Sequence, residues 1–178
     1  MNIRFAASAG IAASAILLSA CAGMSGPKPI AVADLKPTQG NNAGGTVSFI
    51  QKGDQILVDA RIDGLAPGQH GFHVHEKGDC SAPDGMSAGG HFNPGSMNHG
   101  GPSHDNHHAG DLGNVEADGS GKANLQVTLP GKQVSMKEGD ANSIIGKALI
   151  VHADPDDYKT QPTGNSGKRV ACGVVKPV

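Results

Sequence analysis

The sequence predicts an all-β protein built as an antiparallel sandwich or barrel. Short runs of alternating apolar and polar residues recur along the chain, and no segment keeps a helical period over three turns. The 178 residues include 27 glycines and 11 prolines, which is typical of many turns between short strands. Trp is absent and aromatic residues make up only 3% of the chain, so we expect an aliphatic core. These features favour an antiparallel sheet folded around one hydrophobic interior.

The first element, residues 1–20, is predicted to be a signal peptide. It begins with a positive charge at Arg4 and continues as an apolar stretch, Phe5 to Leu18, that is too short for a comfortable membrane span. Its ending, Leu18-Ser19-Ala20-Cys21, resembles the bacterial lipobox, in which cleavage occurs just before a cysteine that is then acylated. The resemblance implies a lipidated Cys21 and a chain anchored to a membrane. A plain secretory signal cut at an Ala-x-Ala-like site is the alternative.

Residues 21–29 are predicted to form a tether, and residues 30–178 a single domain. The tether is small, contains Gly and Pro, and has no periodicity. The formal net charge of the chain is −2 and no basic block is present, which argues against nucleic acid as a partner.

Five runs in the domain have strand character. Gln55 to Ile62 alternates strictly, so its apolar residues should face the core from one side of a strand. Asp118-Gly119-Ser120-Gly121 is typical of a hairpin turn. The five runs are Thr46 to Ile50, Gln55 to Ile62, Asn124 to Leu129, Ala148 to His152 and Val170 to Val175.

Two stretches are too long to be tight turns. Lys77 to Gly110 contains most of the histidines, and Ala153 to Lys168 contains a run of charges. Loops of this length in a small domain are usually functional, so we expect the site to be built from them.

Cysteine usage indicates one disulfide. Three cysteines would normally leave a spare thiol, but if Cys21 carries the lipid, Cys80 and Cys172 remain as a pair. An exported protein can keep a disulfide, and closing a loop of this length would stabilise by about 4–5 kcal/mol on the chain-entropy model. Two free buried thiols are the alternative.

His73-Val74-His75 is the strongest indication of chemistry in the chain. Residues two apart on a strand point to the same face, so this pair would place two imidazoles at one point. Neutral imidazole binds copper and zinc alike. Two ordinary surface histidines are the alternative for an isolated pair, but this pair is followed by further candidate ligands. They are His91, His99, His108, Asp111 and His152.

These residues lie in six motifs that resemble the copper/zinc superoxide dismutase family, in its bacterial exported form. The motifs follow the family order from about residue 30 to the C-terminus. They are Gly71-Phe72-His73-Val74-His75-Glu76, His91-Phe92-Asn93-Pro94, Asn98-His99-Gly100-Gly101-Pro102, Gly110-Asp111-Leu112-Gly113-Asn114-Val115, Val151-His152, and Gly164-Asn165-Ser166-Gly167-Lys168-Arg169-Val170-Ala171-Cys172-Gly173.

The resemblance implies a Greek-key β-sandwich or barrel with two long functional loops. It implies dismutation of superoxide to dioxygen and hydrogen peroxide by a redox-cycling copper with a structural zinc, one of each per subunit. It places the enzyme in the cell envelope, on its periplasmic or extracytoplasmic side, where it would protect the envelope from superoxide. The family includes homodimers and monomers, and the sequence leaves both open.

The resemblance also implies a role for each site residue. His91 would bridge the two metals and supply a proton, and Arg169 would bind and position the anionic substrate. Asp156 would link His73 to His99, although the neighbouring Asp154 and Asp157 leave that register open. Copper would be held by His73, His75, His91 and His152, and zinc by His91, His99, His108 and Asp111.

Three further histidines need separate interpretations. His107 is the alternative to His108 as a zinc ligand, but the His108-x-x-Asp111 step matches the family. His104 and His107 are otherwise interpreted as solvated loop residues or as an accessory metal-capture site, and His70 as structural.

A periplasmic copper or zinc buffer without turnover is the competing function, and a lipid-anchored structural sandwich is a third. Arg169 favours the enzyme, since a buffer has no use for an anion-binding group beside copper.

Overall fold

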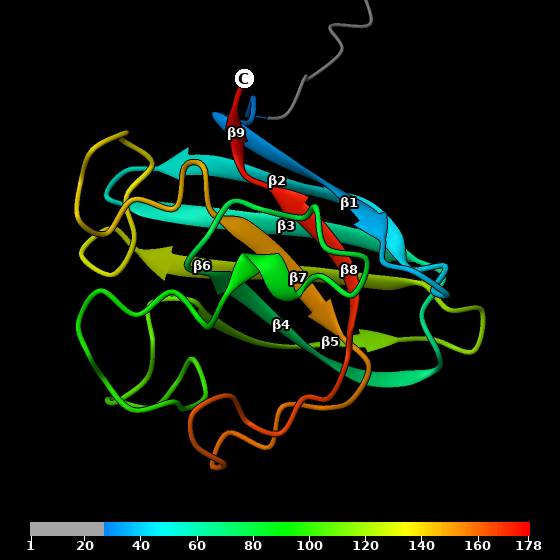
Figure 1. Ribbon diagram of the computed structural model, residues 1–178. Helices are drawn as coiled ribbons and strands as arrows, with labels where there is room; N and C mark the ends of the chain where they lie inside the picture. Colours follow the sequence, from blue (N-terminus) through cyan, green and yellow to red (C-terminus); the bar gives the residue numbers. More distant parts are fainter. Residues whose placement is uncertain (1–26) are drawn as a thin grey trace, which may run out of the picture.

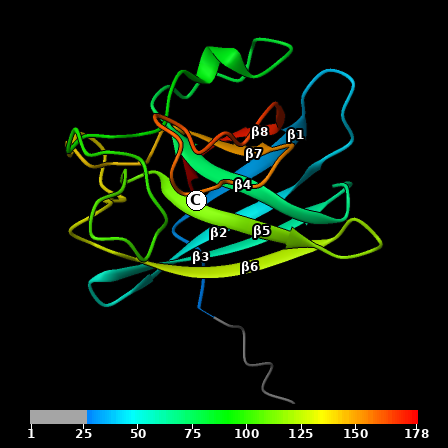
Figure 2. The ribbon, with the colours of Figure 1, turned by 90° about the horizontal axis from the view of Figure 1, so that it is seen from below.

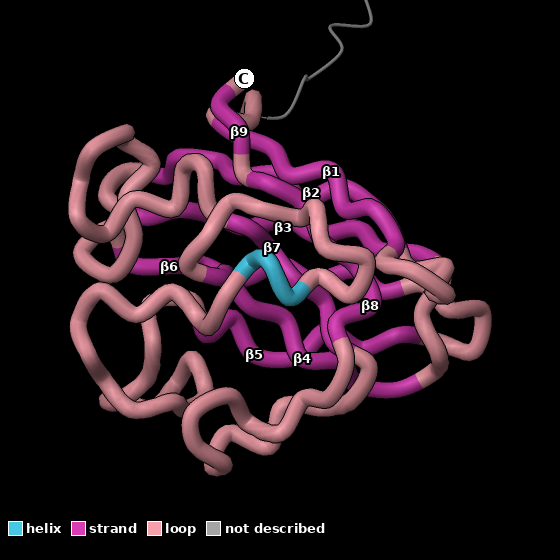
Figure 3. Tube along the Cα trace, in the orientation of Figure 1, coloured by secondary structure: helices cyan, strands magenta, loops and turns pink. Residues whose placement is uncertain are grey.

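A closed antiparallel barrel forms the domain (Figure 1). The computed structural model describes residues 27–178, so the predicted signal peptide of residues 1–20 and Cys21 lie outside the described residues. Within that range the helical content is one short 3₁₀ helix, η1 (Met86–Ala88), drawn in cyan in Figure 3. The strands are β1 (Ala31–Pro37), β2 (Gly44–Lys52), β3 (Gln55–Asp63), β4 (Gly68–His75), β5 (Asp111–Ala117), β6 (Ala123–Pro130), β7 (Ala148–His152), β8 (Arg169–Val174) and β9 (Lys176–Pro177).

The strand order confirms the predicted all-β class and shows how the barrel closes. Neighbours in the sheet follow the order β2-β3-β6-β5-β4-β7-β8-β1-β9, and β1 also pairs with β2. The segment β3-β6-β5-β4 has the strand order of a Greek key, because β4, β5 and β6 lie side by side and β3, which precedes β4 in the chain, lies beside β6. Figure 2 shows this barrel from below, with the long loops gathered around one side.

The core is mainly aliphatic, as the composition predicted, although Phe49, Phe72 and Phe92 are also buried in it. The alternating run in β3 places Ile56, Val58, Ala60 and Ile62 in the interior, where they are almost fully buried. Leu57 lies on the opposite face of β3 and pairs with Ile50 of β2. Val134 and Ile144, from the loop between β6 and β7, also pack into the core.

Two register shifts occur next to the histidines that matter for the site. The pairing of β4 with β5 shifts between Gly71 and His73, and the pairing of β7 with β8 shifts between Val151 and His152. Bulges of this kind re-aim a side chain and are common beside active sites.

The disulfide predicted between Cys80 and Cys172 is present. Their Cα atoms lie 5.8 Å apart, across a sequence separation of 92 residues. The bond ties the loop that follows β4 to strand β8, and therefore brings that loop close to Arg169 at the start of the same strand.

Candidate metal centre

Four imidazoles from distant parts of the chain converge on one point beside β4. His73 and His75 come from β4, His152 from the end of β7, and His91 from the loop after β4. A β-bridge between His75 and His91 holds that loop along the strand. Each residue offers a ring nitrogen, and these nitrogens lie within 4.8 Å of one another. We call His73, His75, His91 and His152 the first donor group.

A second cluster shares one residue with the first. Its ligand atoms also lie within 4.8 Å of one another, and all its members are buried. The shared residue is His91, whose ring lies between the two clusters. We call His91, His99, His108 and Asp111 the second donor group.

Six of the ring nitrogens that point into the two clusters are buried and have no hydrogen-bond partner, whereas a seventh, His91 Nδ1, lies 2.8 Å from Asp111 Oδ1. Buried polar atoms are normally satisfied, so such a concentration of unpartnered nitrogens needs an explanation. Metal coordination supplies one, because a metal ion takes the lone pair of a neutral imidazole. The atoms concerned are His73 Nδ1, His75 Nε2, His91 Nε2, His99 Nδ1, His108 Nδ1 and His152 Nε2.

The opposite ring nitrogens of His73, His75 and His99 are held by fixed acceptors. Asp156 spans the two groups, with Oδ2 2.7 Å from His73 Nε2 and Oδ1 2.9 Å from His99 Nε2. His75 Nδ1 lies 2.9 Å from the carbonyl oxygen of Gly89. Acceptors that hold the ring nitrogen remote from the metal fix the orientation and the tautomer of a histidine, and they thereby affect how strongly it binds the metal.

The position of Asp156 distinguishes it from its acidic neighbours. Asp156 is buried, whereas Asp154 and Asp157 are exposed. Asn114 fixes the Asp156 backbone at both ends: its Nδ2 donates to the carbonyl of Asp156 at 3.0 Å, and its Oδ1 accepts from the Asp156 amide at 2.8 Å. Gly164, at φ 66°, packs so closely that a methyl group there would overlap the carboxylate.

Asp111 is positioned by the backbone of the loop. Its Oδ2 accepts from the amides of Gly100 at 3.1 Å and His108 at 2.8 Å. Its Oδ1 lies 2.8 Å from His91 Nδ1 and 3.3 Å from His108 Nδ1. The carboxylate therefore faces the imidazoles of its own group from a fixed position.

The pKa shifts of the histidines in the first donor group are opposite in direction to that of His99 in the second. Burial lowers the pKa of His152 to about 3 and of His91 to about 4, and it holds the pKa of His75 well below the ordinary value. These imidazoles are neutral at neutral pH and can act as metal ligands. Burial acts against a proton on His99 as well, but the carboxylates of Asp111 and Asp156, 3.1 Å from its Nδ1 and 2.9 Å from its Nε2, outweigh burial and raise the pKa of His99 to about 9.

The interactions between these histidines and the two carboxylates also shift the pKa values of the carboxylates. Burial opposes ionisation of Asp111 and Asp156, yet hydrogen bonds from the histidines around them hold both pKa values well below the usual range. The second donor group is therefore an environment that stabilises a cation, which suits a divalent metal.

Arg169 lies beside the first donor group and is half-buried. Its Nη1 donates to the carbonyl of Gly85 at 2.7 Å, and its Nη2 donates to that of Gly89 at 2.5 Å. The Gly89 carbonyl is the same acceptor that holds His75. Arg169 and a member of the first donor group are thus fixed by one backbone oxygen, in the loop that the disulfide restrains.

Sequence reasoning missed several supports of the site. Gln161 clamps the backbone of His99 from both sides, because its Oε1 accepts from the His99 amide and its Nε2 donates to the His99 carbonyl, each at 2.9 Å. The Gly85 and Gly89 carbonyls were also unforeseen. Backbone acceptors leave no signature in side-chain patterns, so only the fold reveals them.

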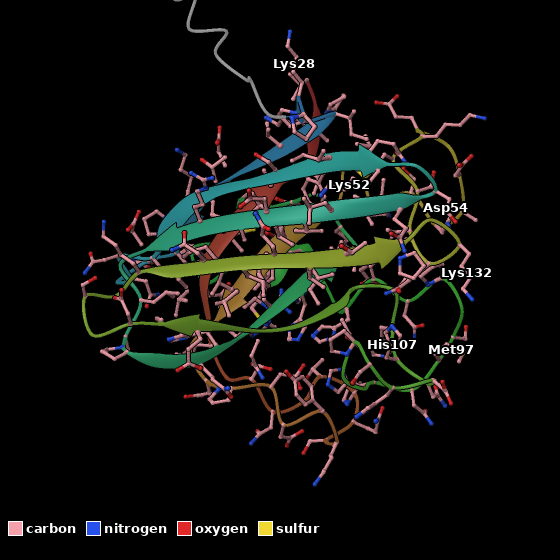
Figure 4. The ribbon with its side chains drawn as sticks, turned by 180° about the vertical axis from the view of Figure 1, so that it is seen from behind. Lys28, Lys52, Asp54, Met97, His107 and Lys132 are labelled. Carbon is pink, nitrogen blue, oxygen red and sulfur yellow. A yellow bond between two sulfur atoms is a disulfide. The ribbon has the colours of Figure 1, made fainter. Side chains whose placement is uncertain are left out.

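The remaining histidines lie outside both groups. His70 is buried, with its ring nitrogens 2.8 Å from the carbonyls of His152 and Ala66, which agrees with a structural role. His107 lies with its Nδ1 2.7 Å from the carbonyl of His104, and it lines a surface pocket with Met97 and Lys132 (Figure 4).

Comparisons with known proteins agree with this geometry. A family model described as copper/zinc superoxide dismutase (SODC) matches residues 43–175. Superoxide dismutase (Cu-Zn) 1 of Aquifex aeolicus (strain VF5) is 43% identical over 136 residues, which cover 74% of this chain and 79% of the relative. Superoxide dismutase (Cu-Zn) 2 of the same organism is 40% identical over 148 residues, covering 81% and 85%. The crystal structure of the clock protein EA4 is similar with a TM-score of 0.74 and 39% identity, covering 85% of this chain and 96% of that one.

Proposed function

The chain belongs to the copper/zinc superoxide dismutase family, and we propose which role each site residue has in the reaction and in which compartment the enzyme acts. Its reaction is the dismutation of superoxide, and its cofactors are copper and zinc. The observation that carries the assignment of residues is the pair of buried donor groups that share His91.

We assign copper to the first donor group and zinc to the second. Four imidazoles with no carboxylate suit Cu(II), whereas three imidazoles and a carboxylate suit tetrahedral zinc. The orientation of His91 supports this division. Its Nε2 is unpartnered on the side of the first group, and its Nδ1 faces Asp111 of the second group. His91 would therefore ligate copper through Nε2 and zinc through Nδ1.

When bound, copper supplies one-electron redox chemistry, and zinc supplies a fixed positive charge with no redox chemistry of its own. The chain supplies the remaining parts of the reaction. Arg169 offers guanidinium N–H groups to the superoxide anion, and its bonds to Gly85 and Gly89 fix where the anion binds. When it does not bind copper, His91 Nε2 would take up a proton from water and pass it to the product. Asp111 and Asp156 keep the surrounding rings in place during that transfer.

The experiment that tests this function measures metal content and superoxide turnover on the same purified protein. We expect one copper and one zinc per chain together with rapid turnover. Full metal occupancy without turnover would favour the copper or zinc buffer instead.

We further propose that the enzyme acts in the cell envelope, on the extracytoplasmic side, held to a membrane by a lipid on Cys21. The lipobox-like Leu18-Ser19-Ala20-Cys21 and the apolar stretch before it support this placement. In residues 27–178 no helix has the length and hydrophobicity needed to cross a bilayer. A Cys21→Ser chain should be released from membranes by a high-salt wash and keep its activity, because salt screens contacts between lysines and headgroups and the anchor and the metal centre are separate. A Cys21→Ser chain that resists the salt wash as the unaltered chain does would refute the lipid anchor.

A further inference from the structure

One end of the barrel brings together the start of β1 and the ends of β2 and β9. Ala31 pairs with Phe49 of β2 and with Pro177 of β9, and the Val178 amide donates to the carbonyl of Ile30 at 3.1 Å. Figure 1 shows the beginning of β1 and the C-terminus side by side. Figure 4 shows Lys28 at the tip of this end, with Lys52 and Asp54 where β2 turns into β3. We call this surface the anchor-side end; it consists of Lys28, Ile30, Lys52, Asp54, Lys176 and Val178.

The anchor-side end combines exposed apolar and basic side chains. Of the four exposed large hydrophobic residues in the described chain, two lie here: Ile30 is 37% exposed and Val178 is 81% exposed. The same surface carries three exposed lysines, Lys28, Lys52 and Lys176, and the exposed carboxylate of Asp54. A surface of this composition suits a membrane interface, where apolar groups enter the boundary of the acyl chains and lysines reach anionic headgroups.

We propose that the anchor-side end is a membrane-docking surface, and that its partner is a bilayer containing anionic lipids. The proposal rests on the lipid anchor proposed for Cys21, which precedes Lys28 by seven residues. Seven residues span at most about 25 Å when extended, so the anchor would hold this end within that distance of the bilayer. Tethering raises the effective concentration of the surface at the membrane, so even weak contacts would orient the domain.

Docking by this end would leave the metal centre open to water. The loop of residues 153–168, which supplies Asp156, lies at the opposite side of the barrel from the two ends of the described chain (Figure 1). Arg169 follows that loop directly. A domain that lay on the membrane by its anchor-side end would therefore present Arg169 away from the bilayer, toward its anionic substrate.

The absence of Trp from the natural chain allows a direct test with single tryptophan reporters. A Val178→Trp chain and a Lys159→Trp control, each with its lipid, are reconstituted into vesicles of phosphatidylcholine and phosphatidylglycerol with brominated acyl chains. We expect bromine to quench Val178→Trp and to leave Lys159→Trp unchanged. If the chain binds the vesicles but neither tryptophan is quenched, the docking surface is overturned and the lipid anchor is not contradicted. A chain that fails to float with the vesicles would overturn the anchor.

A second measurement tests docking without the anchor. The Cys21→Ser chain is titrated with unbrominated vesicles of the same two lipids, alone and with Lys28, Lys52 and Lys176 changed to Gln. Each lysine near an anionic surface should contribute about fivefold to partitioning, so the three changes together should weaken it by about 100-fold. The matched control changes Lys122, Lys159 and Lys168 to Gln, which are exposed and give the same loss of charge elsewhere on the barrel. Equal partitioning of the two triple variants would overturn the docking surface.

Discussion

Replacing Asp156 by Ala should weaken the binding of both metals at once. Asp156 contacts His73 Nε2 at 2.7 Å and His99 Nε2 at 2.9 Å, so one truncation frees a ring in each donor group. Removing a partner that orients a metal-binding histidine costs about 10–100-fold in affinity. Each hydrogen bond to a charged group is worth about 1.5–3 kcal/mol, which agrees with that range. We therefore expect copper and zinc affinity each to fall by about 10–100-fold.

The assay is competition with a chelator of known affinity, for each metal separately, on the folded protein. Asp154→Asn is the matched control, because Asp154 is an exposed acidic residue two positions away in the same loop. Circular dichroism would show that both variants keep the β-structure. Wild-type affinity for both metals in Asp156→Ala would refute the reasoning. Equal losses in Asp154→Asn would show that loop charge, and not the link between the two histidines, controls affinity.

Three further predictions concern other parts of the site. Arg169→Ala should keep both metals and lower the superoxide rate by about 10–100-fold, as expected for the loss of a charge-assisted hydrogen bond; steady-state kinetics at wild-type rate would remove Arg169 from the mechanism. His108→Ala should lose zinc and thermal stability, whereas His107→Ala should keep stoichiometric zinc; metal analysis with the reverse pattern would move the ligand by one position. Reducing the Cys80–Cys172 disulfide should lower the melting temperature and the activity, because the loop carrying the Arg169 acceptors is released; a reduced protein with unchanged melting and rate would contradict that link.

The strands that could be predicted are those whose own sequence alternates or forms a short apolar run, as in β7 and β8. The alternation of residues 55–62 places one face in the core, and β3 buries that face as predicted. β1 contains Asp34 and Lys36, and β5 contains Asp111, Asn114 and Glu116, so neither has a strong local signal. Their formation depends on pairing with neighbours already in the barrel, which local periodicity does not describe.

The candidate site followed from different information. His73 and His75 could be placed on one face from strand periodicity alone, and the register shift beside His73 adjusts their aim. No local pattern places His91 or His152 beside them, because they come from a loop and from another strand; the ordered family motifs supplied that grouping. The backbone acceptors at Gly85 and Gly89 came only from the structure, since any residue has a carbonyl.

The central claim is that one imidazole, His91, is shared by the two metals. The most direct measurement is the electron paramagnetic resonance spectrum of Cu(II) in the copper-loaded protein, recorded before and after one equivalent of zinc. A shared ring predicts that zinc changes the copper spectrum, and that the change disappears in His91→Ala although zinc still binds. A copper spectrum that is insensitive to zinc in the unaltered protein, with both metals bound, would contradict the shared ligand.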